Sequence, residues 1–74
     1  MLPKAKFVSF LDHLRIFDYY VFVIGYMDGE IEIRESKGMK NLFQSGEHDG
    51  GFVKKCSVYS RDNCLHMAVL LVSE

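Results

Sequence analysis

The chain has 74 residues, of which 49% are hydrophobic, 14% aromatic and 26% charged. This composition is typical of a globular domain and excludes a disordered tail, a collagen-like repeat and a coiled coil. Nine Lys and Arg against ten Asp and Glu leave a net charge of −1, which argues against both a strongly basic nucleic-acid clamp and a polyacidic decoy.

A chain of this length has room for only a small core, so it needs a dense apolar interior, a disulfide, a metal or a partner subunit. We expect residues 1–74 to form a single domain. The longest uncharged apolar run, residues 19–27, is far shorter than the ~20 residues of a membrane helix. No secretory signal is recognisable either, so the sequence predicts a cytoplasmic protein without membrane contact.

The N-terminal segment, residues 5–17, predicts a helix. Its apolar residues recur at spacings of three and four, as on one face of a helix: Phe7, Val8, Phe10, Leu11, Leu14 and Phe17. Pro3 suits a position at or just before a helix start. The bulky β-formers at the beginning of this segment leave a short strand as the alternative.

Residues 17–36 predict a β-hairpin. Residues 19–24 are aromatic or β-branched, Asp28-Gly29 is a strong two-residue turn signal, and residues 30–34 alternate with period two. Pairing Met27 with Glu30 assigns one face to the core: Tyr20, Phe22, Ile24, Tyr26, Ile31 and Ile33. A slip of one residue would bury Glu30 and Glu32, so we expect this register to be well specified.

Residues 38–51 are rich in glycine and predict a flexible loop. Within it, Met39, Leu42 and Phe43 are expected to form one short helical turn.

Residues 52–59 and 64–73 predict a second hairpin, with Tyr59 opposite Cys64 across a turn at residues 60–63. A C-terminal helix capped by Asp62 or Asn63 is the competing interpretation. In the hairpin, Cys56 and Cys64 lie on opposite faces, which predicts two free thiols.

Together these segments predict an α+β fold, with an N-terminal helix packed on a small antiparallel sheet of two β-hairpins. The alternative is a small all-β barrel.

No set of residues points to catalysis or to a cofactor. His48, Cys56, Cys64 and His66 lack the paired short spacings of a zinc site. Cys64 and His66 are two residues apart on an extended strand, about 7 Å, which is too far for a nucleophile and its base. We therefore expect a non-enzymatic protein without metal or cofactor.

The second sheet face is too apolar for a surface in water, which predicts a protein-binding patch rimmed by charges. The expected partner-binding residues are Val21, Val23, Met27, Glu30, Glu32, Arg34, Tyr59 and Leu70. If so, Val23→Asp would break assembly without unfolding the monomer. The other interpretation is that the 38–51 loop covers this face, or that the two hairpins stack on each other.

The predicted function is therefore a small protein-binding module, acting as a homodimer or as an inhibitor or adaptor of a larger partner. Its length also fits a complete small reading frame, such as a viral or mobile-element accessory protein. The alternative function is nucleic-acid binding through sheet aromatics and the second hairpin, using Tyr19, Lys54, Lys55 and Arg61.

Overall fold

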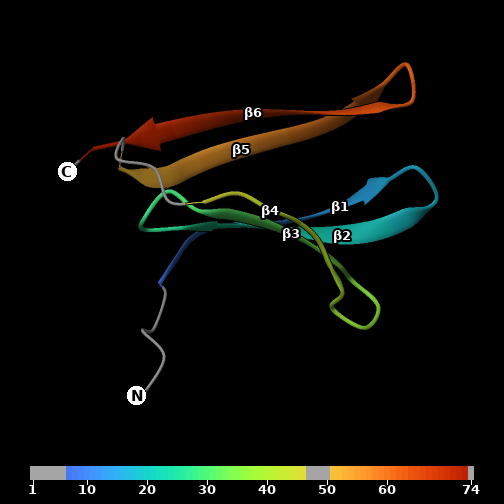
Figure 1. Ribbon diagram of the computed structural model, residues 1–74, viewed down its shortest axis with the longest axis horizontal. Helices are drawn as coiled ribbons and strands as arrows, with labels where there is room; N and C mark the ends of the chain where they lie inside the picture. The colour runs from blue at the N-terminus through green and yellow to red at the C-terminus, as the bar shows by residue number, and fades with distance from the viewer. Residues whose placement is uncertain (1–6, 47–50, 74) are drawn as a thin grey trace.

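The protein has an all-β fold of two antiparallel sheets. The structure is a computed structural model that describes residues 7–46 and 51–73. One sheet has four strands in the order β1-β2-β3-β4 and the other has two, β5-β6. Figure 1 shows the β5–β6 hairpin lying along one side of the four-stranded sheet. The strands are β1 (Val8–Ile16), β2 (Tyr19–Tyr26), β3 (Ile31–Glu35), β4 (Asn41–Gln44), β5 (Phe52–Arg61) and β6 (Cys64–Val72).

The predicted α+β class is wrong, because residues 8–16 form β1 and the described residues contain no helix. In β1 the apolar residues divide between two faces: Phe10 and Leu14 point toward the core, whereas Leu11 points away from it. Two interleaved rows with period two produced spacings of three and four that imitate a helix. The all-β part of the alternative agrees with the structure, but the sheets do not close into a barrel.

The first hairpin forms as predicted, but its register differs by one residue. Tyr26 and Glu30 pair around a three-residue loop in which Gly29 has a φ of 86°. This loop is a turn followed by a residue in the left-handed conformation, which is the common form of a three-residue hairpin loop. The pairs are Val21–Glu35, Phe22–Arg34, Val23–Ile33, Ile24–Glu32 and Gly25–Ile31.

The one-residue shift exchanges the two faces of β2, whereas Ile31 and Ile33 of β3 stay on the core side as predicted. Val21 and Val23 are fully buried in the core, and the predicted core residues Phe22, Ile24 and Tyr26 are only partly buried on the opposite face.

Glu30 and Glu32 are buried as well, but they lie on the face of β3 opposite Ile31 and Ile33, so the shift does not place them in the core between the sheets. The fold tolerates these carboxylates because both have partners. Arg34 and Tyr26 donate to Glu32, and the Gln44 side-chain amide donates to Glu30.

The core lies between the two sheets, where β5 crosses β1 and β2. Its centre consists of aliphatic side chains and one thiol: Ile16, Val21, Val23, Ile31, Ile33, Val53 and Cys56. Further apolar side chains pack around this centre: Phe10, Leu14, Val58, Met67 and Leu71. The two-stranded sheet is therefore held to the four-stranded one by a narrow aliphatic contact.

The segment predicted as a flexible loop contains β4. The helical turn expected at Met39, Leu42 and Phe43 is wrong, because residues 41–44 pair with β3. Residues 47–50 of the predicted loop, including His48, lie outside the described residues.

The second hairpin also forms, with β6 a strand and not a helix. Arg61, and not Tyr59, pairs with Cys64, and the turn consists of Asp62 and Asn63, both with positive φ. This shift of two residues preserves the predicted faces of Cys56 and Cys64. A bulge at Lys54 then turns Val53 toward the core, against the prediction.

Candidate functional site

The four-stranded sheet presents an apolar face that the β5–β6 hairpin does not cover. We call it the outer aromatic face, and it consists of Leu11, His13, Tyr20, Phe22, Ile24 and Tyr26. Leu11 is 60% exposed and Tyr20 is 55% exposed. The register places Leu11 beside Ile24 and His13 beside Phe22, so β1 and β2 form one continuous surface.

A cluster of rings lies at the centre of this face. The His13 ring stacks on Phe22 with centroids 4.6 Å apart, and it lies 5.4 Å from the Tyr20 ring at a tilt. His13 Nε2 is also 3.1 Å from the Ser36 hydroxyl oxygen, and this hydrogen bond orients the imidazole ring. Aromatic side chains have only two side-chain torsions, so they provide a large contact area at a small loss of conformational entropy. Surfaces that bind other proteins are rich in such side chains.

The arginines around the outer aromatic face already have acidic or carbonyl partners. Arg34 Nε donates to Glu32 Oε2 at 2.8 Å, and its Nη1 donates to the Met39 carbonyl oxygen. Arg15 lies 3.9 Å from Asp18 in an exposed pair. Arg34 is therefore neutralised beside the apolar centre of this face, whereas Arg15 and Asp18 form only a loose pair in water.

Tyr26 connects the outer aromatic face to the buried carboxylate of Glu32. The Tyr26 hydroxyl donates to Glu32 Oε2 at 3.2 Å. Burial, followed by the nearby Glu32 charge, raises the pKa of Tyr26 above its ordinary value of 10.0.

This raised pKa predicts a loss of stability in strong base. The folded protein holds the phenol proton more tightly than the unfolded chain, so unfolding releases a proton and is favoured as pH rises above 10. Tyr26→Phe should therefore flatten the decline of the free energy of unfolding between pH 9 and 11, as measured by urea denaturation monitored by circular dichroism. An unchanged slope in Tyr26→Phe would contradict the assignment.

The predicted partner-binding residues are not brought together. Val21 and Val23 are in the core, and Glu30 and Glu32 are buried, so four of the eight are withdrawn from the surface. Met27 is exposed at the β2–β3 turn, and Arg34 is partly exposed on the outer side of β3.

The other two predicted residues, Tyr59 and Leu70, are exposed on the second sheet. The Tyr59 ring stacks on His66 across the hairpin, with centroids 5.1 Å apart. Their side of the hairpin faces away from the core, so they form a surface separate from the outer aromatic face.

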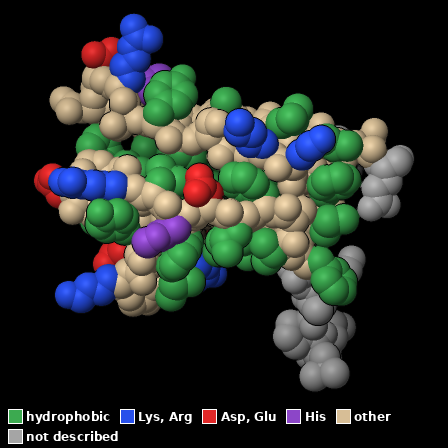
Figure 2. Space-filling model, turned by 180° about the vertical axis from the view of Figure 1, so that it is seen from behind, with side chains coloured by type: hydrophobic (Ala, Val, Ile, Leu, Met, Phe, Trp, Pro, Cys, Tyr) green, Lys and Arg blue, Asp and Glu red, His purple; other side chains and the backbone are tan. Residues whose placement is uncertain are grey.

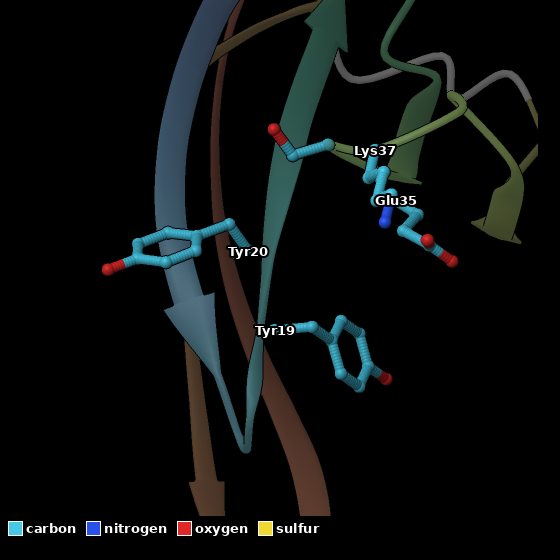
Figure 3. Close-up of a pocket in the computed structure, with 5 residues that line it drawn as sticks. Tyr19, Tyr20, Glu35 and Lys37 are labelled. Atoms are coloured by element: carbon cyan, nitrogen blue, oxygen red, sulfur yellow. The ribbon is translucent and has the colours of Figure 1, made fainter.

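A shallow depression lies where β2 begins, lined by Tyr19, Tyr20, Glu35, Ser36 and Lys37. Figure 3 shows the Tyr19 and Tyr20 rings on opposite sides of β2, with Glu35 and Lys37 on the side of Tyr19. The two rings thus border the depression without enclosing it, and no set of polar groups converges on one point.

The two cysteines are free thiols in different surroundings. Cys56 is buried, and burial together with the Asp12 charge raises the pKa of its thiol above 9.0, which disfavours the reactive thiolate. Cys64 is exposed at the tip of the hairpin. In the described part of the chain, no three His, Cys, Asp or Glu side chains are grouped to hold a metal ion.

Sequence reasoning missed the outer aromatic face because it assigned Leu11 to a helix and the apolar residues of β2 on this face to the core. The available signal was the concentration of aromatic residues in β2 beside the smaller Val21 and Val23. Small β-branched side chains fit the space between two packed sheets. This rule can be applied only after the register shows which residues face that space.

Comparison with protein-family models, curated proteins and solved structures finds no match for this chain. Within residues 7–46 and 51–73, no helix has the length and apolar character needed to cross a membrane.

Proposed function

We propose that the protein is a non-enzymatic binding module that uses the outer aromatic face to hold a protein partner. The observation that carries this proposal is the exposure of Leu11 and Tyr20 beside the stacked rings of His13 and Phe22. Monomeric proteins rarely leave such a contiguous apolar surface in water, and aromatic side chains are enriched at protein interfaces. The proposal includes a cytoplasmic location, supported by the two free thiols.

The charges on this face favour a protein over a nucleic acid. Phosphate backbones require cations that are available to neutralise them, whereas Arg34 is bound to the buried carboxylate of Glu32. The basic residues of the alternative function, Lys54, Lys55 and Arg61, belong to β5 in the other sheet. An apolar centre beside a neutralised arginine suits a partner that offers an aliphatic or aromatic ridge.

The proposal is tested by affinity capture from the native host with two matched variants. Tyr20→Asp places a charge on the outer aromatic face, and Tyr59→Asp makes the same change at a tyrosine of similar exposure, 52%, on the other sheet. We expect proteins captured by the wild type to be lost with Tyr20→Asp and retained with Tyr59→Asp. Circular dichroism establishes that both variants are folded.

Equal capture by the two variants would contradict the proposed site. Titration against RNA and DNA at two salt concentrations tests the alternative. Steeply salt-dependent binding that Tyr20→Asp abolishes would replace the protein partner with a nucleic acid.

A further inference from the structure

The open edge of β6 belongs to the two-stranded sheet, whereas the outer aromatic face of the proposed function belongs to the four-stranded sheet. Among the described residues, the strands at sheet edges are β1, β4, β5 and β6. Edge strands expose unpaired N–H and C=O groups, and proteins protect them with charges, bulges or short length. The first three edges have such protection. β1 contains Asp12, Arg15 and a bulge, β4 has four residues, and β5 contains Lys54, Lys55 and a bulge.

β6 has none of these features. It runs for nine residues, Cys-Leu-His-Met-Ala-Val-Leu-Leu-Val, without Asp, Glu, Lys, Arg or Pro. Its only described neighbour is β5, and the extra residue of the bulge belongs to β5, so β6 itself is regular. Seen from behind, the molecule shows many hydrophobic side chains, with Lys and Arg at its left margin and also among the hydrophobic side chains of its upper half (Figure 2).

The turn of the hairpin determines which backbone groups face the open edge. Asp62 and Asn63 both have positive φ, as in a type I′ turn, so the flanking residues Arg61 and Cys64 form a hydrogen-bonded pair. Hydrogen-bonded and non-hydrogen-bonded pairs then alternate along the strand. The N–H and C=O groups of Leu65, Met67 and Val69 therefore point away from β5.

We infer that this edge binds a second copy of the chain, with the two β6 strands antiparallel about a two-fold axis at Ala68. This register pairs all nine residues of the strand and exchanges hydrogen bonds between Met67 and Val69 on both sides of the axis. A two-fold contact joins the same surface on both copies and leaves neither β6 edge open. The two hairpins become one four-stranded sheet.

The side chains are self-complementary in this register. On the core side Leu65 lies opposite Leu71, and Met67 lies opposite Val69, so each cross-strand pair is apolar. No charged side chain of β6 opposes another, because β6 has none. Leu65 also lines an apolar groove of about 250 Å³ with Leu42 and Phe43 of β4. The Leu71 of the second copy would lie next to this groove.

A cysteine at the axis tests the pairing directly. Ala68 opposes itself in a non-hydrogen-bonded pair, where Cα atoms are about 4.5 Å apart, within the range that a disulfide spans. We expect Cys64→Ser/Ala68→Cys to form a disulfide-linked dimer on mild oxidation. The control is Cys64→Ser/Ser57→Cys, because Ser57 is the neighbour of Ala68 on β5, on the same side of the hairpin. It should remain a monomer on non-reducing gels.

A charge exchange provides a second measurement without oxidation. Ala68→Lys and Ala68→Glu each place like charges directly opposite one another, which should weaken the dimer by about fivefold, whereas an equimolar mixture should recover it. Light scattering of the wild type should give twice 8.6 kDa. A wild-type mass of 8.6 kDa at millimolar concentration, or equal cross-linking at positions 57 and 68, would overturn the inference.

Discussion

Val23→Asp is expected to unfold the protein at 25 °C. Val23 is fully buried between the sheets, and its cross-strand neighbour Asp12 would repel a new carboxylate there. An unpaired carboxylate in such a site costs several kcal/mol even after relaxation, a large part of the ~5–15 kcal/mol that stabilises a domain. Far-UV circular dichroism and thermal melting should show the loss of the cooperative transition.

Leu11→Asp is the matched control for this prediction. Leu11 lies on the outer aromatic face, where an added carboxylate stays in contact with water. It should keep the fold and change stability by less than about 1 kcal/mol. A folded Val23→Asp that has lost only its ability to associate would instead support the original assignment of Val23 to an interface.

The contrast between Val23 and Leu11 shows where sequence reasoning reaches its limit. Both faces of β2 carry apolar residues, so hydrophobic alternation identifies this strand without choosing which of its faces shares the core with Ile31 and Ile33. The choice depends on whether the turn after Tyr26 has two residues or three. Gly29 adopts a left-handed conformation that serves either turn, so the local sequence leaves the register open.

In the second hairpin the faces of the two cysteines were predicted correctly, because the error in strand pairing was two residues. An even shift returns each side chain to its original face, so Cys56 stayed in the core and Cys64 on the opposite side. The bulge at Lys54 could not be foreseen, and it is the bulge that directs Val53 inward.

The sequence placed the predicted binding patch on residues that the fold does not bring together. The excess of apolar residues over what one core needs pointed to a binding surface, and that remains a proposal. Its location required knowing that residues 8–16 are a strand, because Leu11 and His13 of β1 complete the face begun by Tyr20 and Phe22. A helix at the same residues would have covered that face.

Gly25→Ala is expected to lower the free energy of unfolding by about 1–3 kcal/mol, as overpacking of a dense core does. A Cβ atom built on Gly25 would lie 2.5 Å from Val53 Cγ1 and 2.6 Å from its Cβ. β5 cannot simply move aside, because the Val53 carbonyl oxygen accepts a hydrogen bond from the Ser9 hydroxyl at 2.6 Å. The absence of a side chain at Gly25 is what lets the two sheets approach here. Urea denaturation measures the change.

Two comparisons separate this close approach from the general effect of replacing a glycine. Gly46→Ala adds the same methyl group where no atom lies within 4 Å, and it should leave stability nearly unchanged. Val53→Ala removes the nearer of the two clashing atoms, so Gly25→Ala should cost less in that background than in the wild type, a coupling that a double-mutant cycle detects. Strictly additive effects of the two substitutions would mean that Gly25 does not set the distance between the sheets.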